Sequence, residues 1–210
     1  MDQAQQLRNV VKQKNIKKTS GMNSNARVLT ITSGKGGVGK SNLAVNLAIQ
    51  LRKFGKRVII FDADIGLANV EVMFGATPRY NLNDMIYKGK NLKDIVSEGP
   101  MGVGFISGGS GIAGLSNLTV DQIQMLLRNL DELDDLADVI IIDTGAGISH
   151  SVLKFVLNSP EILLVTTPEP SSITDSYSLL KVLYQQPDFK PQQTTIHLVA
   201  NKVLSAADGE

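Results

Sequence analysis

Eight consecutive residues near the start of the chain, GKGGVGKS from Gly34 to Ser41, carry the chemistry that most narrows its function. They fit the phosphate-loop pattern G-x-x-x-x-G-K-[ST]. Glycines let backbone N–H groups curl around an anion, Lys40 would reach the β- and γ-phosphates, and Ser41 would hold Mg²⁺. A second lysine, Lys35, follows the first glycine. We therefore predict a nucleotide site that contains Gly34, Lys35, Gly36, Gly37, Val38, Gly39, Lys40, Ser41 and Asn42.

Further polar residues follow apolar runs of the chain, namely Asp62, Asp64, Asp143 and Asn201. Asp143 ends the run VIIID, where a carboxylate suits Mg²⁺ directly or through a water bound to the ion. The alternative for Asp143 is a purely local role in the turn. Asp62 and Asp64 would face the same side if their segment stayed extended. A turn there would separate them, so that one points at the nucleotide while the other supports the loop.

The elements that must position these residues alternate along the chain. Apolar runs predict strands over 28–32, 57–61, 102–107, 139–142, 161–166 and 194–200, and helical periodicity predicts helices over 41–54, 119–131, 149–158 and 171–184. Such alternation favours an α/β fold with three layers, a doubly wound and mostly parallel sheet covered on both faces. Ligands bind at the carboxyl ends of the strands of such sheets, where the polar residues above would meet.

Length and composition narrow the class of protein. The 210 residues suit one α/β domain, and the net charge of +1 gives no global argument for nucleic acid. The absence of cysteine excludes disulfides, iron–sulfur clusters held by thiolates and thiolate zinc sites. No apolar run is long enough to span a bilayer, and the polar N-terminus does not resemble a signal peptide. We expect His150 and His197 to be structural, because their spacing does not suit a metal site.

The first 20 residues differ from the rest, with a net charge of +4 against −3 for the other 190. Ala4, Leu7, Val10 and Val11 would line one face of a short helix. We predict an amphipathic helix over 1–18, a linker over 19–25 and a phosphate-loop domain over 26–210. A basic amphipathic helix of this length needs a surface to dock on. The alternative is a disordered, solubilising tail.

The motifs together resemble the deviant Walker A ATPases of the MinD/ParA family, P-loop NTPases of the SIMIBI class. Lys35–Ser41 resembles the deviant Walker A loop, and Asp62–Asn69 resembles switch I of MinD. Asp143–Gly147 resembles Walker B with switch II. Thr167–Ser176 resembles the segment of MinD that follows the strand after Walker B. The match covers about Arg27 to Lys202.

The resemblance implies a role for each matching residue. Lys35 would reach the phosphates of the partner subunit's nucleotide, and Asp64 would orient the attacking water. Ser41, Asp64 and Asp143 would serve the magnesium site. Asn201 would read adenine, and Glu169 would lie near the dimer face. The implied activity is slow, Mg²⁺-dependent ATP hydrolysis by a homodimer that forms on ATP.

Within the family, the head Asp2-Gln3-Ala4-Gln5-Gln6-Leu7-Arg8 resembles the D-Q-A-x-x-L-R motif of the FlhG subfamily, which limits flagellar number and placement. This implies as partner FlhF, a GTPase of the signal-recognition-particle type that the segment activates, and flagellar switch (C-ring) proteins as further candidates. We expect Gln3 to reach the GTPase site, Ala4 and Leu7 to dock, and Arg8 to meet acidic or phosphate groups.

Relatives continue beyond the strand at 194–200 and end in an amphipathic helix that binds membrane. We therefore expect 26–210 to be a C-terminally truncated ATPase domain, and the intact protein to be cytoplasmic with reversible association with the inner face of the cell membrane. Two alternatives stay open. One is a ParA-type DNA-segregation ATPase, against which the charge of −3 outside the head argues. The other is a binding module with negligible turnover.

Overall fold

The computed structural model describes residues 24–64, 67–109, 118–205, 207 and 209. The predicted head helix and its partner-binding residues lie outside these ranges. Within them, seven strands form one sheet in the order β3-β4-β2-β5-β1-β6-β7, and all pairings are parallel except β3 with β4. The strands are β1 (Arg27–Ser33), β2 (Val58–Ala63), β3 (Ser97–Glu98), β4 (Gly104–Ile106), β5 (Val139–Ala146), β6 (Glu161–Thr166) and β7 (Thr195–Ala200).

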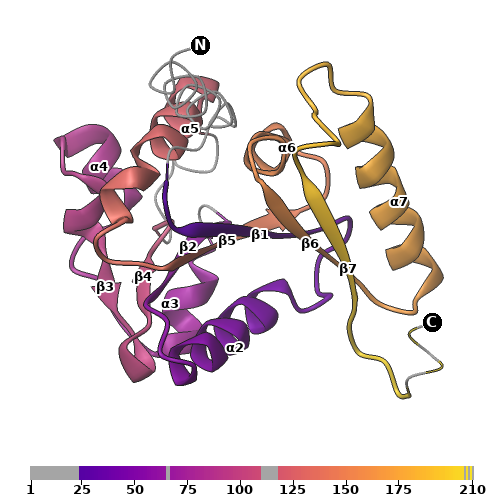
Figure 1. Ribbon diagram of the computed structural model, residues 1–210, viewed down its shortest axis with the longest axis horizontal. Helices are drawn as coiled ribbons and strands as arrows, with labels where there is room; N and C mark the ends of the chain where they lie inside the picture. The colour runs from indigo at the N-terminus through magenta and orange to yellow at the C-terminus, as the bar shows by residue number, and fades with distance from the viewer. Residues whose placement is uncertain (1–23, 65–66, 110–117, 206, 208, 210) are drawn as a thin grey trace, which may run out of the picture.

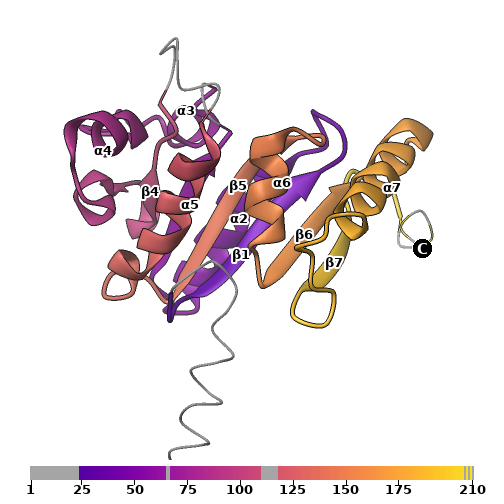
Figure 2. The same ribbon diagram turned by 90° about the horizontal axis from the view of Figure 1, so that it is seen from above.

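Helices lie on both faces of this sheet, and Figure 1 shows α2 and α3 on one side with α5 and α6 on the other. Figure 2 shows α5, α6 and α7 side by side across the strands. The α-helices are α2 (Lys40–Lys53), α3 (Asn69–Phe74), α4 (Leu82–Lys88), α5 (Val120–Arg128), α6 (His150–Leu157) and α7 (Pro170–Tyr184). Three short 3₁₀ helices are η1 (Leu92–Ile95), η2 (Pro100–Gly102) and η3 (Asn129–Leu133). The predicted three-layer, doubly wound α/β fold is confirmed.

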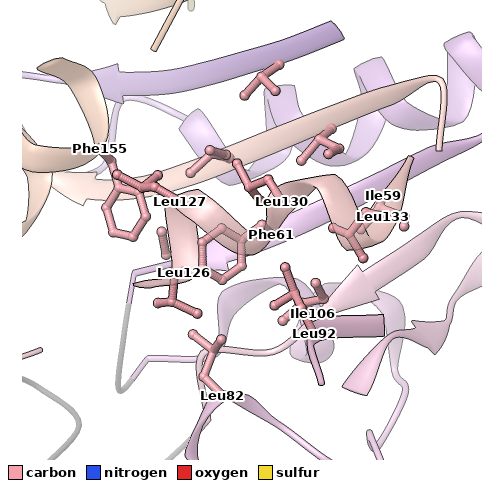
Figure 3. Close-up of a cluster of buried hydrophobic side chains, with 14 of the residues drawn as sticks. Ile59, Phe61, Leu82, Leu92, Ile106, Leu126, Leu127, Leu130, Leu133 and Phe155 are labelled. Atoms are coloured by element: carbon pink, nitrogen blue, oxygen red, sulfur yellow. The ribbon is translucent and has the colours of Figure 1, made fainter. Parts of the chain in front are cut away.

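Two apolar cores hold the layers together, one on each side of the sheet. Figure 3 shows the core beneath α5 and α6, where Phe61 and Phe155 make an edge-to-face contact with ring centroids 5.7 Å apart. The second core packs α2 against the sheet through Ala44 and Ala48, which are fully buried. Small side chains let α2 approach the strands closely, which fixes the position of the loop before it.

Several element boundaries differ from the prediction. The strand expected over 102–107 is shorter because the chain turns at 100–102, where Met101 has a positive φ of 57°. The helix expected over 119–131 ends as an α-helix at Arg128 and continues as η3. The sequence pattern does not predict α3, α4 and the antiparallel strand β3, which are six, seven and two residues long. Elements this short carry too few periodic positions to be recognised.

Asp134 anchors the start of the folded domain. Its carboxylate accepts hydrogen bonds from the hydroxyl of Ser24 at 2.5 Å and from the backbone N–H groups of Asn25 and Ala26 at 2.8 and 3.2 Å. These bonds lower the pKa of Asp134 against the opposing effect of burial. Ser24 and Asn25, which we assigned to the linker, are therefore held by the domain.

Candidate functional site

The phosphate loop lies between β1 and α2, where left-handed glycines turn the chain into the helix. Gly39 has a φ of 98° and precedes the first residue of α2. A Cβ on Gly39 would be strained, and it would lie 2.5 Å from Nδ2 of Asn201. Asn201 follows β7 and donates a hydrogen bond to the carbonyl of Val38 at 2.8 Å. The residue predicted to read adenine therefore also holds the phosphate loop.

The other end of the loop lies against α7. A Cβ on Gly34 would lie 2.1 Å from the carbonyl carbon of Asp175, so the backbones of the loop and of α7 pack directly together. Glycine is required at this position because any side chain would push the two apart. Lys202, which the sequence analysis did not single out, donates a hydrogen bond to the carbonyl of Gly37 at 2.8 Å. The loop is thus held by α7 at Gly34 and by the segment after β7 at Gly37 and Val38.

Lys40 and Asp143 form a buried pair of charges below the loop. Lys40 is only 8% exposed, and burial lowers its pKa while Asp143 and Asp64 raise it. Both carboxylate oxygens of Asp143 are buried, and neither accepts a hydrogen bond of normal geometry from the described residues. Burial raises the pKa of Asp143 to about 6, against the lowering effects of the Ser41 hydroxyl and Lys40.

A buried carboxylate whose oxygens accept no hydrogen bond is costly unless cations neutralise its charge. Asp143 and the hydroxyl of Ser41 are oxygen donors of the kind that Mg²⁺ prefers. Among the described residues, no group of three or more His, Cys, Asp or Glu side chains could hold a metal by itself. The site therefore fits a magnesium ion that is shared with nucleotide phosphates, the usual arrangement for this ion.

The two carboxylates at the end of β2 have separate surroundings. Asp62 is fully buried and accepts hydrogen bonds from the backbone N–H groups of Asp64 at 3.1 Å and Val70 at 3.0 Å. Burial raises the pKa of Asp62 to about 7, although both hydrogen bonds lower it. Asp64 accepts a hydrogen bond from Nδ2 of Asn69 at 3.0 Å and faces Gly145, whose Cβ would lie 3.0 Å from Oδ1. Asp62 therefore supports the segment between β2 and α3, and the carboxylate of Asp64 faces the segment that follows Asp143.

The side chain of Lys35 extends toward the start of α7. Its ammonium donates to the carboxylate of Glu169 and to the hydroxyl of Ser171, both at 2.8 Å. The side chains of Lys35 and Glu169 are 37% and 60% exposed, so the pair lies at the surface. Lys35 lowers the pKa of Glu169. Sequence reasoning missed Ser171 and Asn69 as individual contacts, although both lie within motifs that it recognised.

The two histidines lie on different elements. His197, on β7, contacts the carboxylate of Glu161 on β6 at 3.1 Å through Nε2. His150 begins α6. Across the residues with described positions, no helix is both long and apolar enough to cross a membrane.

Comparisons with known proteins point to one family. A ParA family model described as an NUBPL iron-transfer P-loop NTPase matches residues 24–186. The antiactivator FleN of Pseudomonas aeruginosa is 41% identical over 183 residues, which cover 87% of this chain and 64% of FleN. The flagellum site-determining protein YlxH of Helicobacter pylori is 37% identical over 209 residues, which cover 99% and 69% of the two chains. The chain thus spans about two thirds of the length of these relatives.

Among solved structures, MinD of Pyrococcus horikoshii in complex with Mg-ADP matches with a TM-score of 0.66 at 24% identity, over 83% of this chain and 70% of that one. At this identity, the match supports the fold of the chain alone. The family match covers the phosphate loop, both aspartate strands and the whole of α7. The chain therefore belongs to the ParA/MinD family of P-loop NTPases, with FleN and YlxH among its relatives.

Proposed function

We propose that the protein is a Mg²⁺-dependent ATPase that acts as a molecular switch in the control of flagellar number and placement. The observation that carries the proposal is the convergence of Lys40, Asp64 and Asp143 around the phosphate loop, in a chain 41% identical to FleN. FleN and YlxH are described as an antiactivator and a flagellum site-determining protein. Those descriptions support flagellar regulation as the role of this chain.

The chain's own residues suit phosphoryl transfer by positioning and charge. The backbone of residues 34–40 would cradle the phosphates, and Lys40 would neutralise charge on the transferred group. Ser41 and Asp143 would hold Mg²⁺, which would supply charge stabilisation for the phosphates when bound. Asp64 would orient the attacking water, as the resemblance to switch I implies; its carboxylate interacts electrostatically with Lys40 and Asp143. Little covalent chemistry is required of the protein.

The switch would operate through dimers. Lys35 lies at the surface, on the side of the loop that faces α7, where a second subunit would have access to it. ATP would favour a homodimer in which each Lys35 reaches the other subunit's phosphates, and hydrolysis would release it. The head, residues 1–18, would stimulate the GTPase activity of an FlhF-type partner. The intact protein would be cytoplasmic and associate reversibly with the inner face of the cell membrane.

A turnover titration tests this proposal. ATP hydrolysis is measured with Mg²⁺ alone, then with the GTPase partner and with anionic lipid vesicles added in turn. The proposal predicts slow basal turnover that disappears in Lys40→Ala, together with GTPase stimulation that requires residues 1–18. ATP binding without any turnover would contradict the ATPase assignment and favour a binding module. Salt-sensitive DNA binding in ATP would instead favour the ParA-type role.

A further inference from the structure

Helix α3 is too short to hold its own position. It contains six residues, Asn69–Phe74, and an isolated helix of fewer than about 12 residues is marginal in water. Ala68, directly before it, has a left-handed φ of 47° and no side-chain capping bond. The helix nevertheless carries Asn69, whose amide donates to Asp64 at 3.0 Å. The position of Asp64 therefore depends on contacts that fix α3 from outside.

One such contact joins α3 to the end of β4. The hydroxyl of Ser107, which is fully buried, donates a hydrogen bond of 2.6 Å to the carboxylate of Glu71. The same hydroxyl accepts from the backbone N–H of Gly109 at 3.0 Å, and the carbonyl of Ser107 accepts from the N–H of Leu82 at 3.2 Å. Ser107 is therefore held by backbone hydrogen bonds of its own, and Glu71 bonds to it.

The other contacts of α3 hold it against the sheet, and the bond between Glu71 and Ser107 adds a restraint of a different kind. Val70 is buried and its N–H bonds to Asp62, and Phe74 meets Phe105 edge-to-face with centroids 5.4 Å apart. These contacts hold the helix against the sheet at two positions of its apolar face. The bond from Glu71 adds a polar contact whose geometry is directional, which restricts rotation of the helix about its own axis.

We propose that Glu71 and Ser107 form a tether that positions Asp64 for hydrolysis through α3 and Asn69. Glu71 is a positioning residue, because the carboxylate that faces the reaction is that of Asp64. The inference rests on the proposed function, in which Asp64 orients the attacking water. It predicts that loss of the tether lowers turnover while nucleotide binding, which depends on the phosphate loop, is retained.

The test compares steady-state kinetics of variants of the whole chain. Ser107→Ala and Glu71→Ala should each lower kcat about tenfold, the effect expected from loss of a hydrogen bond to a charged group, with KM for ATP within about twofold of wild type. The double variant should be no slower than either single variant, because both remove the same bond. Glu71→Gln keeps an acceptor at the same length and should restore most of kcat. Glu98→Gln removes the charge of an exposed acidic residue of β3 and is the control for the loss of one negative charge.

The outcomes separate this inference from the proposed function. Wild-type kcat in Ser107→Ala, with Asp64→Asn inactive, overturns the tether alone. Normal turnover in Asp64→Asn overturns the assigned role of Asp64 and the tether with it. Additive effects in the double variant, or a parallel loss of ATP affinity and thermal midpoint in both Glu71→Ala and Glu71→Gln, also contradict it. A kcat loss that Glu71→Gln rescues, with the thermal midpoint unchanged, supports it, since a general loss of stability would lower that midpoint.

Discussion

The ammonium of Lys35 lies 2.8 Å from the carboxylate of Glu169, and this ion pair joins the phosphate loop to the segment that begins α7. The hydroxyl of Ser171, in the first turn of α7, accepts from the same ammonium. Within one chain, the ammonium of Lys35 is therefore held by two side chains that follow β6. Its position at the surface leaves it accessible to a second molecule.

The first prediction is that Lys35 acts between subunits, as the resemblance to the deviant Walker A loop implies. Lys35→Ala should leave ADP affinity near that of wild type, because Lys40 and the loop backbone remain. It should reduce ATP-dependent dimerisation and ATP turnover together. Sedimentation with Mg-ATP and with Mg-ADP measures the first effect, and Glu169→Gln tests the contact without removing the lysine. Full dimerisation of Lys35→Ala on ATP would exclude the role between subunits.

The second prediction concerns Asp64. Asp64→Asn keeps the shape of the side chain and removes its charge. ATP should still bind, and hydrolysis should fall by roughly two orders of magnitude, as expected when a group that orients water is lost. Phosphate release in single-turnover experiments measures the effect. Asp62→Asn is the comparison, since Asp62 bonds to backbone N–H groups. Unchanged turnover in Asp64→Asn would shift the assignment to Asp62.

The third prediction is a pH dependence of stability in the metal-free protein. Burial raises the pKa of Asp143 to about 6, above its ordinary value of 3.8. A carboxyl with a raised pKa in the folded state contributes stability below its unfolded pKa and loses it as pH rises through the folded pKa. The free energy of unfolding of wild type should therefore fall relative to Asp143→Asn between pH 4 and pH 7, by about 2 kcal/mol.

Urea denaturation in EDTA at several pH values measures this difference. Other carboxyls titrate in both proteins and cancel in the comparison. Addition of Mg²⁺ with ADP should reverse the trend in wild type alone, because the ion favours the charged form of Asp143. A difference that is constant with pH would show that Asp143 titrates normally.

The phosphate loop, its flanking strand and helix, and the aspartates at the sheet edge could be predicted from the sequence. Their signals are local, because a glycine-rich loop or an apolar run shows its role in a few neighbouring residues. The bond between Ser107 and Glu71 could not be predicted, since it joins residues from separate elements. The different hydrogen-bond partners of Asp62 and Asp64 could not be predicted for the same reason. Val70 and Asn69 bond to these carboxylates from α3, an element too short to be recognised in the sequence.

The fourth prediction concerns the head. A peptide of residues 1–20 should stimulate GTP hydrolysis by an FlhF-type GTPase without the ATPase domain. Gln3→Ala should abolish stimulation, because the amide would orient water, while Leu7→Asp should abolish binding by placing a charge on the docking face. Deleting residues 1–20 should preserve ATP affinity, since Asp134 still anchors Ser24 and Asn25. An inert peptide combined with an unfolded deletion variant would make the head part of the domain.

The central claim is that ATP and ADP give two different assemblies of the same chain. Sedimentation velocity of Asp64→Asn, which should hold ATP without hydrolysing it, measures this most directly when Mg-ATP and Mg-ADP are compared at one protein concentration. The account predicts a dimer in Mg-ATP and a monomer in Mg-ADP, with the Lys35→Ala/Asp64→Asn double variant monomeric in both. The same sedimentation coefficient for Asp64→Asn in ATP and ADP, with both nucleotides shown to be bound, would contradict it.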